Sequence, residues 1–337
     1  MTIKILTTLG PSSLNKETVQ QLEQNGVHLF RINLSHTRLE DLEEIIFKIN
    51  SWSSTPICLD SEGAQVRNGF MKDNKVFYKL KDSVVIHNQP IIGDSNNISF
   101  TPATLCNQLE EGDEIRVDFN SVRFLITSKN GNIVKGKVTS NGHVGSNKAV
   151  DINKDIKLPA ITPKDVDAFN LGLKMGIKHY ALSFTNTAKD VLLAREIIGD
   201  SNLISKIESI DGVLNLKDIL PLVDQILIDR GDLSRQISIE KIPFIQRSII
   251  SYAKNFETPV YVATNLLESM TNNEGPTRAE ANDVASTLLM GASGLVLAAE
   301  TAIGKYPVES VKTINSIIKE YKRWTPKTSL QEIVSFD

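Results

Sequence analysis

Residues 203–232 read LISKIESIDGVLNLKDILPLVDQILIDRGD, and this stretch contains one complete unit of the fold. Apolar runs near its two ends enclose a segment with the spacing of an amphipathic helix, which predicts two parallel strands joined by a helix. Glu208 and Asp232 come at the ends of these runs, and Lys206 stands two residues before Glu208, on the same strand face. The two carboxylates beside a fixed positive charge predict a site for Mg²⁺ or Mn²⁺, because both ions prefer oxygen ligands.

The composition is that of a globular protein with a large core. The 337 residues are 41% hydrophobic and 23% charged, enough for one barrel-sized domain and a smaller one. Because 37 Lys and Arg residues nearly balance 40 Asp and Glu residues, the net charge of -3 provides no general attraction for nucleic acid or an anionic membrane. Cys58 and Cys106 lack the spacing of a metal site or a disulfide framework, and no signal peptide or membrane-length apolar run is apparent. We expect a soluble, cytoplasmic protein that binds neither nucleic acid nor membranes.

Short apolar or β-branched runs alternate with amphipathic stretches along most of the chain, which is typical of parallel β/α units. The expected strands are 3–8, 28–33, 56–60, 179–184, 203–208, 225–229, 259–264 and 294–298. The expected helices are 16–25, 39–51, 163–175, 188–198, 211–220, 240–256, 278–290 and 308–322. Eight such strands predict an α/β fold closed as a (β/α)8 TIM barrel. A Rossmann arrangement is the alternative, but no Gly-x-Gly-x-x-Gly follows the first strand.

The third unit of this series is interrupted. Between Asp60 and Pro163, turns rich in Gly, Asn and Asp separate alternating segments, which predicts a small all-β domain. Its expected strands include 84–87, 114–118, 122–127 and 133–138. We expect this domain to span 69–154, with the barrel formed by 1–68 and 155–337, and to act as a lid over the barrel mouth.

Polar and charged side chains recur where the expected barrel strands end. In a parallel barrel the loops at these ends converge on one mouth, where catalytic groups gather. Arg31, Arg67 and Lys206 around a divalent ion would suit a phosphoryl group, because guanidinium groups and a metal neutralise the charge that shifts during transfer. Each residue alone has an ordinary explanation as a surface or loop residue. Independent surface charges, however, are not expected to fall at the same end of six different strands. The residues at these strand ends are Arg31, Asn33, Ser35, His36, Asp60, Glu62, Lys206, Glu208, Arg230, Asp232, Thr264, Asn265, Glu300 and Thr301.

Seven motifs, in this order along the chain, resemble those of the pyruvate kinase family. They are RINLSH at 31–36, LDSEG at 59–63, SKIE at 205–208, RGDL at 230–233, ATNLLESM at 263–270, PTRAE at 276–280 and ETAIGKYP at 300–307. The resemblance extends from Thr2 to about Lys322 and is weakest across the inserted domain. The family has a (β/α)8 barrel with a β-rich lid inserted after strand three, which agrees with the periodicity.

The resemblance implies phosphoryl transfer between phosphoenolpyruvate and ADP, giving pyruvate and ATP. It makes Glu208 and Asp232 the ligands of the divalent metal, and Lys206 the cation that stabilises the phosphoryl group and the enolate. The residues that correspond to the family's cradle for a monovalent cation, K⁺, are Asn33, Ser35, Asp60 and Ser61.

The resemblance also assigns substrate contacts. Arg31 and Arg67 are similar to the family's phosphate-contacting arginines, and Thr264 matches the threonine beside the reactive carbon of the substrate. The backbone around Gly231, next to Asp232, would hold the carboxylate of the substrate.

Some positions differ from the family's pattern near the expected mouth. Residues 61–65 read Ser-Glu-Gly-Ala-Gln, where the family usually has Thr-Lys-Gly-Pro-Glu. Glu62 therefore replaces a lysine, which should weaken the attraction for a nucleotide phosphate. Gln65 replaces an acid that accompanies dependence on a monovalent cation, so we expect a relaxed K⁺ requirement.

Other departures lie towards the end of the chain. Ala298 and Ala299 replace a Ser-Gly pair and remove a hydroxyl often assigned to the proton relay, and Asn265 replaces a glutamine. The sequence given stops at Asp337, shortly after the last expected barrel helix, so we expect the family's carboxyl-terminal regulatory domain and its control by sugar phosphates to be absent.

Two other classes of function stay open from the sequence. One is an enzyme that forms or cleaves carbon–carbon bonds through a metal-bound enolate on the same barrel site, which Glu62, Gln65 and Ala298 motivate. The other is a non-catalytic descendant that binds a ligand or a partner protein. The PTRAE segment at 276–280 could join subunits of a homo-oligomer, although helix-start chemistry and barrel packing explain it almost equally well.

Overall fold

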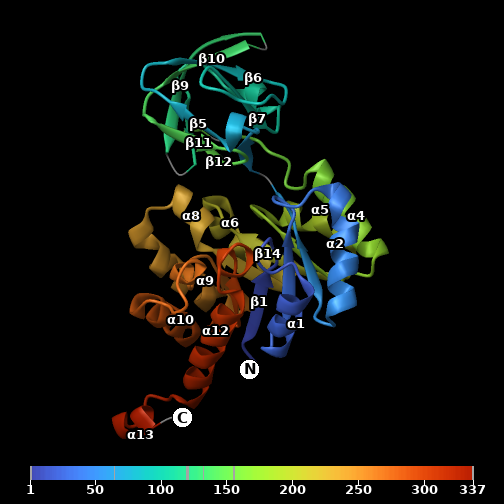
Figure 1. Ribbon diagram of the computed structural model, residues 1–337, viewed down its shortest axis with the longest axis vertical. Helices are drawn as coiled ribbons and strands as arrows, with labels where there is room; N and C mark the ends of the chain where they lie inside the picture. Colours follow the sequence, from blue (N-terminus) through green and yellow to red (C-terminus); the bar gives the residue numbers. More distant parts are fainter. Residues whose placement is uncertain (1, 64, 119–120, 132, 155, 336–337) are drawn as a thin grey trace. The chain divides into compact units, whose positions relative to one another are not determined.

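The computed structural model describes residues 2–63, 65–118, 121–131, 133–154 and 156–335, which form two compact units (Figure 1). One unit consists of Met1–Gly63 and Ala160–Asp337, and the other of Ala64–Pro159. The small unit begins earlier than the expected residue 69, because the strand β4 (Val66–Asn68) pairs with the strands β7 (Asn97–Thr101) and β12 (Ala149–Ile152) of that unit. It also ends later than the expected residue 154, because Ile156 and Leu158 pack against its core.

The larger unit is a closed barrel of eight parallel strands, which confirms the predicted (β/α)8 fold. Around the barrel the strands follow the order β1, β17, β16, β15, β14, β13, β3 and β2. Their bounds are β1 Lys4–Thr8, β2 Leu29–Asn33, β3 Ile57–Asp60, β13 His179–Leu182, β14 Asn202–Ile207, β15 Gln225–Asp229, β16 Val260–Ala263 and β17 Gly294–Leu297. Their inward-facing side chains fill the barrel with a separate cluster: Leu6, Leu29, Cys58, Ala181, Ile204, Leu227, Tyr261, Ala263 and Val296.

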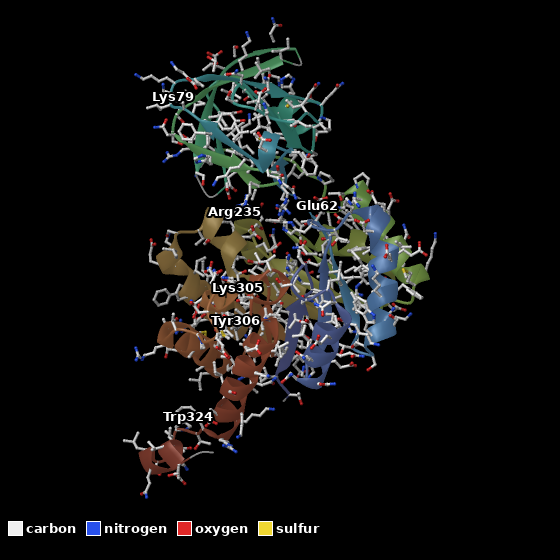
Figure 2. All side chains as sticks on the ribbon, in the orientation of Figure 1. Glu62, Lys79, Arg235, Lys305, Tyr306 and Trp324 are labelled. Carbon is white, nitrogen blue, oxygen red and sulfur yellow. The ribbon has the colours of Figure 1, made fainter. Side chains whose placement is uncertain are left out.

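Helices surround these strands and bury their apolar faces against them. The long ones are α1 Lys16–Gln24, α2 Leu39–Trp52, α4 Pro163–Lys174, α5 Ala188–Ile198, α9 Ile242–Lys254, α10 Arg278–Met290 and α12 Pro307–Arg323. Leu22, Ile46, Phe169, Ile249 and Ile314 are members of the core formed between helices and strands. Figure 2 labels Tyr306 and Trp324, which flank α12. Among the helices of the described residues, none combines the length and the apolar composition that a membrane span requires.

Several helices differ from those expected. The segment expected as one helix at 211–220 is divided into α6 (Ile210–Leu214), α7 (Leu216–Ile219) and the 3₁₀ turn η2 (Leu220–Leu222). Asn215 interrupts it with φ -94° and ψ 11°, and Pro221 lies in the closing 3₁₀ turn. The segment expected at 240–256 begins as the turn η3 (Ile239–Lys241) before α9. In the described part of the larger unit, three short α-helices were not expected: α8 Arg230–Gln236, α11 Ala299–Ala302 and α13 Leu330–Ser335.

The smaller unit is a closed β-barrel with its own core. The strands of this barrel lie in the order β10, β6, β7, β4, β12, β8 and β9, and β11 pairs with β5 in a separate two-stranded sheet. The bounds are β5 Lys75–Tyr78, β6 Ser83–His87, β7 Asn97–Thr101, β8 Glu114–Val117, β9 Val122–Asn130, β10 Ile133–Val138, β11 Gly142–Gly145 and β12 Ala149–Ile152, with the 3₁₀ turn η1 Lys72–Asn74 and the helix α3 Leu105–Gln108. The expectation of an all-β insertion after the third barrel strand agrees with this architecture.

Candidate active site

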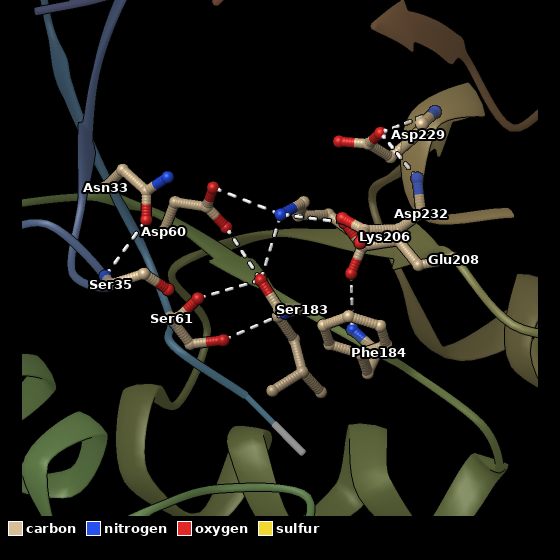
Figure 3. Close-up of polar contacts among 12 residues, drawn as sticks. Asn33, Ser35, Asp60, Ser61, Ser183, Phe184, Lys206, Glu208, Asp229 and Asp232 are labelled. Atoms are coloured by element: carbon tan, nitrogen blue, oxygen red, sulfur yellow. Dashed lines mark hydrogen bonds and ion pairs between the residues drawn. The ribbon is translucent and has the colours of Figure 1, made fainter. Parts of the chain in front are cut away.

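The ammonium group of Lys206 lies in a buried cluster of charges (Figure 3). Its Nζ atom is 3.2 Å from Oδ2 of Asp60 and 2.9 Å from Oε1 of Glu208, and it donates a hydrogen bond of 2.9 Å to the hydroxyl of Ser183. Burial by itself lowers the pKa of Lys206, but Asp60 and Glu208 hold this pKa above its ordinary value. Lys206 is therefore a fixed positive charge, as the sequence predicts.

Asp60 connects Lys206 to a second cation. Its Oδ2 is 3.4 Å from Nη1 of Arg31, so one carboxylate oxygen is shared between the guanidinium and the ammonium groups. Arg31 is 6% exposed and Asp60 is fully buried. Two buried cations therefore share one carboxylate near the carboxyl ends of β2, β3 and β14, where their N–H groups are hydrogen-bond donors suited to an anionic oxygen.

Ser183 belongs to this cluster, although the sequence analysis did not single it out. Its hydroxyl is 2.7 Å from the carbonyl oxygen of Ser61 and 3.2 Å from Oδ1 of Asp60, so its one proton has two acceptors, of which the carbonyl is the closer. Its backbone N–H donates to Oγ of Ser61 at 2.8 Å. The sequence analysis missed Ser183 because it counted this residue inside the expected strand 179–184. In the structure β13 ends at Leu182, so Ser183 is the first residue of the loop that follows. A serine directly after a barrel strand was the available signal.

Three carboxylates form a cluster beside Lys206. One oxygen atom of each of Glu208, Asp229 and Asp232 lies within 4.8 Å of the others. Glu208 and Asp232 were predicted as metal ligands, whereas Asp229 was counted only as the last residue of a strand. Burial, reinforced by Asp232 and Asp229 and opposed by Lys206, raises the pKa of Glu208 above its ordinary value. Burial and Asp229 also raise the pKa of Asp232.

This donor set fits a divalent cation. Oε2 of Glu208 accepts the backbone N–H of Phe184 at 2.7 Å, while the contact of Oε1 with Lys206 is an ion pair without hydrogen-bond geometry. Oε1 is buried and has no hydrogen-bond partner among the described residues. Oxygen ligands that repel each other in a buried site are what Mg²⁺ or Mn²⁺ would stabilise.

Asp229 also organises the loop that carries Asp232. It is the N-cap of α8, where its Oδ1 accepts the backbone N–H groups of Gly231 at 3.1 Å and Asp232 at 3.4 Å. The same oxygen accepts the hydroxyl of Thr264 at 2.5 Å. A Cβ atom at Gly231 would lie 2.8 Å from Cγ2 of Thr264, so this close approach requires glycine. The structure thus brings together the predicted residues Gly231, Asp232 and Thr264.

Arg230 fixes the conformation of Thr264. The backbone of Thr264 has φ +77°, an uncommon value for a residue with a β-branched side chain. Nε and Nη2 of Arg230 donate to its carbonyl oxygen at 3.1 and 2.6 Å, and Nη1 of Arg230 is 2.6 Å from Oδ2 of Asp283 in α10. These contacts stabilise the backbone of Thr264, whose hydroxyl donates to Asp229.

With this geometry, comparison with known proteins settles the family. A family model described as pyruvate kinase, barrel domain, matches residues 1–311. The chain belongs to the pyruvate kinase family. Proteins named pyruvate kinase are 32% identical in Thermotoga maritima, over 95% of this chain and 71% of the relative, and 34% identical in Thermococcus litoralis, over 94% and 69%. A third, from Corynebacterium efficiens, is 33% identical over 94% of this chain and 69% of its own length.

The residues predicted to form the pyruvate kinase cradle for a monovalent cation lie at the ends of β2 and β3 (Figure 3). Asn33 is the register partner of Asp60, and its Oδ1 accepts the backbone N–H of Ser35 at 3.0 Å. Ser61 and Asp60 both contact Ser183. The four side chains are therefore neighbours, while their role as K⁺ ligands stays a prediction.

Two residues of the predicted pyruvate kinase site belong to the other unit. Nη1 of Arg67, in β4, donates to the carbonyl oxygen of Asn147 at 2.8 Å. Gln65 directly precedes β4. The phosphate contact predicted for Arg67 and the effect on K⁺ predicted for Gln65 both stay predictions.

The first two residues of the motif ETAIGKYP, Glu300 and Thr301, form hydrogen bonds with neighbouring backbone groups. The carboxylate of Glu300 is 2% exposed and accepts the backbone N–H groups of Leu267 at 3.1 Å and Ala298 at 2.9 Å. The hydroxyl of Thr301 donates to the carbonyl oxygen of Thr8 at 2.9 Å. These contacts tie the short helix α11 to the loop after β16, to the residue that follows β17 and to the end of β1.

Proposed function

We propose that this member of the pyruvate kinase family transfers a phosphoryl group between phosphoenolpyruvate and ADP, with Mg²⁺ or Mn²⁺ bound. The observation that carries this proposal is the position of Lys206. Its ammonium group is buried among Asp60, Ser183 and Glu208 and stands next to the carboxylate cluster. We also propose small-molecule substrates and a cytoplasmic location, while assembly into a homo-oligomer stays an open prediction.

Glu208 and Asp232 would hold the divalent ion, with Asp229 within reach of both. When bound, the ion supplies charge neutralisation and polarises a coordinated oxygen. Lys206 provides a second, permanent positive charge at the same place. Because it is already held by two carboxylates, little reorganisation is needed when negative charge develops on the ligand.

In the direction of ATP synthesis, the bond between phosphorus and the enol oxygen breaks while a terminal phosphate oxygen of ADP forms a new bond to phosphorus. Lys206 stabilises the negative charge left on the enol oxygen, and Arg31 orients the phosphoryl group. The electron pair on the enolate carbon then takes up a proton. Ala298 offers no hydroxyl for this step, so we propose that a water molecule delivers the proton.

Phosphoenolpyruvate and ADP should be converted to pyruvate and ATP in the presence of Mg²⁺ and K⁺. The Glu208→Ala variant tests the proposal, because it removes a carboxylate of the metal site. The matched control is Glu43→Ala, which removes an exposed carboxylate on α2. The proposal fails if wild-type turnover does not exceed that of Glu208→Ala. Repeating the assay without K⁺ tests the relaxed requirement expected from Gln65.

A second candidate is an enzyme that makes or breaks carbon–carbon bonds through a metal-bound enolate. The observation that favours it is Glu62, which stands where the family usually has a lysine. Its Oε2 lies 3.9 Å from Nζ of Lys164, so an acid is paired with this ammonium group in place of a second cation. Calorimetry discriminates the two functions. Oxalate, a mimic of the enolate, should bind with Mg²⁺ in both cases, whereas ADP should bind only to the phosphotransferase.

A further inference from the structure

Asp229 holds three hydrogen-bond donors that converge on one point beside the metal site. Its Oδ1 accepts the N–H of Gly231, the N–H of Asp232 and the hydroxyl of Thr264, at 3.1, 3.4 and 2.5 Å. Arg230 donates two hydrogen bonds to the carbonyl oxygen of Thr264, which restrains the backbone that carries this hydroxyl. The three donors therefore form a rigid receptor for one anionic oxygen, and a side chain of the protein already fills it.

The negative charge of Asp229 is a second obstacle to a ligand carboxylate at these donors. One oxygen of its carboxylate lies within 4.8 Å of oxygens of both Glu208 and Asp232. A ligand with an oxygen on the divalent ion and a neighbouring carboxylate on the Gly231 and Thr264 donors would meet this third negative charge. An N–H or O–H group donates one good hydrogen bond, so two carboxylates cannot both use these donors at full strength.

We propose that Asp229 is a specificity-determining residue that acts as an internal carboxylate ligand of this site. It occupies the donors that would otherwise bind the carboxylate of a metal-chelating oxoacid, and it must move away before such a ligand binds. The inference rests on the proposed function, because it takes the Gly231 and Thr264 donors as the position of the ligand carboxylate. Its consequence is a weakened affinity for carboxylate-bearing chelators, while anions held by Lys206 and Arg31 are less affected.

Calorimetry with oxalate tests this at Mg²⁺ concentrations that saturate each variant, established beforehand from the displacement of bound Mn²⁺ by Mg²⁺ followed by electron paramagnetic resonance. Asp229→Ala frees the donors, so it should bind oxalate about tenfold more tightly than the wild type, the effect of one hydrogen bond to a charged group. The matched control is Asn15→Ala, which removes the N-cap of α1, where Asn15 accepts the N–H of Thr18. This control should leave the affinity for oxalate unchanged.

Inorganic phosphate is the second probe, because it separates occupied donors from simple charge repulsion. Phosphate is expected at the cations Lys206 and Arg31 and not at the Gly231 donors, so Asp229→Ala should raise its affinity by much less than that of oxalate. An unchanged affinity for oxalate, or an equal rise for both anions, would overturn the proposal.

A further variant allows the proposal to be tested if Asp229→Ala does not fold. Asp229→Asn preserves an N-cap acceptor but removes the negative charge, so it should bind oxalate more tightly than the wild type and less tightly than the alanine variant. No gain in Asp229→Asn would equally overturn the proposal. These measurements do not involve ADP or turnover. Failure of the phosphotransferase assay would therefore remove the proposed function without deciding the role of Asp229.

Discussion

Ser183 supplies a neutral contact to the ammonium group of Lys206, whose partners also include the carboxylates of Asp60 and Glu208. We predict that Ser183→Ala lowers kcat for phosphoenolpyruvate and ADP by about 10- to 100-fold, because a hydrogen bond to a charged group is worth about 1.5–3 kcal/mol. KM for phosphoenolpyruvate should change less, since Arg31 and the metal ligands stay in place. Steady-state kinetics with varied phosphoenolpyruvate measures both parameters.

Ser205 is the matched control for this prediction. It lies on β14, one residue before Lys206, and its buried hydroxyl has no hydrogen-bond partner among the described residues. Ser205→Ala therefore removes a hydroxyl that donates nothing, and both kcat and stability should change little. A loss in Ser205→Ala as large as that in Ser183→Ala would show that packing, and not the contact with Lys206, explains the effect.

Residues of the site could be predicted from the sequence where a charged residue stands at or just after the end of an apolar strand. Lys206, Glu208 and Asp232 were found in this way. Asp229 was missed because its contribution depends on α8, a seven-residue helix whose sequence RGDLSRQ carries little apolar periodicity. Ser183 was missed because its place in the site depends on contacts with residues of β3 and β14. Only the register of the barrel strands brings those residues next to it.

At the scale of elements, Asp165 ties the loop after β3 to the start of α4. It is fully buried, and its carboxylate accepts the N–H groups of Glu62 at 2.7 Å and Gly63 at 3.1 Å, together with the N–H and hydroxyl of Thr162 at 3.1 and 2.8 Å. We predict that Asp165→Asn lowers the free energy of unfolding by about 2–4 kcal/mol, because an amide nitrogen would then face buried donors. Chemical denaturation measures this loss.

Asp167→Asn is the matched control for Asp165→Asn. Asp167 lies on the same helix, two residues later, and is exposed. Its substitution should change the free energy of unfolding by less than about 0.5 kcal/mol. Equal losses in the two variants would contradict the role given to the contacts with Glu62 and Gly63.

Glu280 forms a capping box with Thr277 at the start of α10 and also binds Ser269. Partial burial raises the pKa of Glu280, but the hydrogen bonds from Ser269 and Thr277 outweigh it and hold this pKa below its ordinary value near 4.5. A depressed pKa means that the unfolded chain binds the proton more tightly. The resulting stability is present above about pH 4.5 and is lost as the pH falls through the folded-state pKa.

We therefore predict that Glu280→Gln destabilises the barrel unit by about 1 kcal/mol at pH 7. The difference from the wild type should shrink as the pH falls below 4.5. Thermal unfolding between pH 3.5 and 7 measures it, with the exposed Glu274→Gln as control. A difference that stays constant over this range would show that the carboxylate charge of Glu280 contributes nothing.

The boundaries of elements follow from the sequence to within a few residues where apolar periodicity is strong. The helix expected at 278–290 is α10, Arg278–Met290, and the strand expected at 225–229 is β15, Gln225–Asp229. The strand expected at 179–184 is too long, because the chain turns at Phe184 with φ +49°. That turn directs the N–H of Phe184 towards the carboxylate of Glu208. Strand propensity could not predict this turn, because it depends on a contact with another strand.

At the scale of the whole molecule, the clustered charges of the metal site belong to only one of the two units. Glu208, Asp229 and Asp232 lie in the barrel unit, and so do Trp52 and Trp324, the two tryptophans of the sequence. The small unit, Ala64–Pro159, contains no tryptophan in its sequence. Tryptophan fluorescence therefore reports the unfolding of the barrel unit alone, whereas circular dichroism reports both units.

We predict that Mg²⁺ raises the unfolding temperature of the wild type as followed by tryptophan fluorescence. A ligand at 100 times its Kd stabilises the folded state by about 2.7 kcal/mol, and relief of the repulsion among the three carboxylates is the physical source. Chelation should reverse the shift, and Glu208→Ala should abolish it, whereas Glu43→Ala should keep it. If the change seen by circular dichroism resolves into two steps, only the step that coincides with the fluorescence change should move with Mg²⁺. A Mg²⁺-dependent shift that survives in Glu208→Ala would place the ion elsewhere and contradict the site.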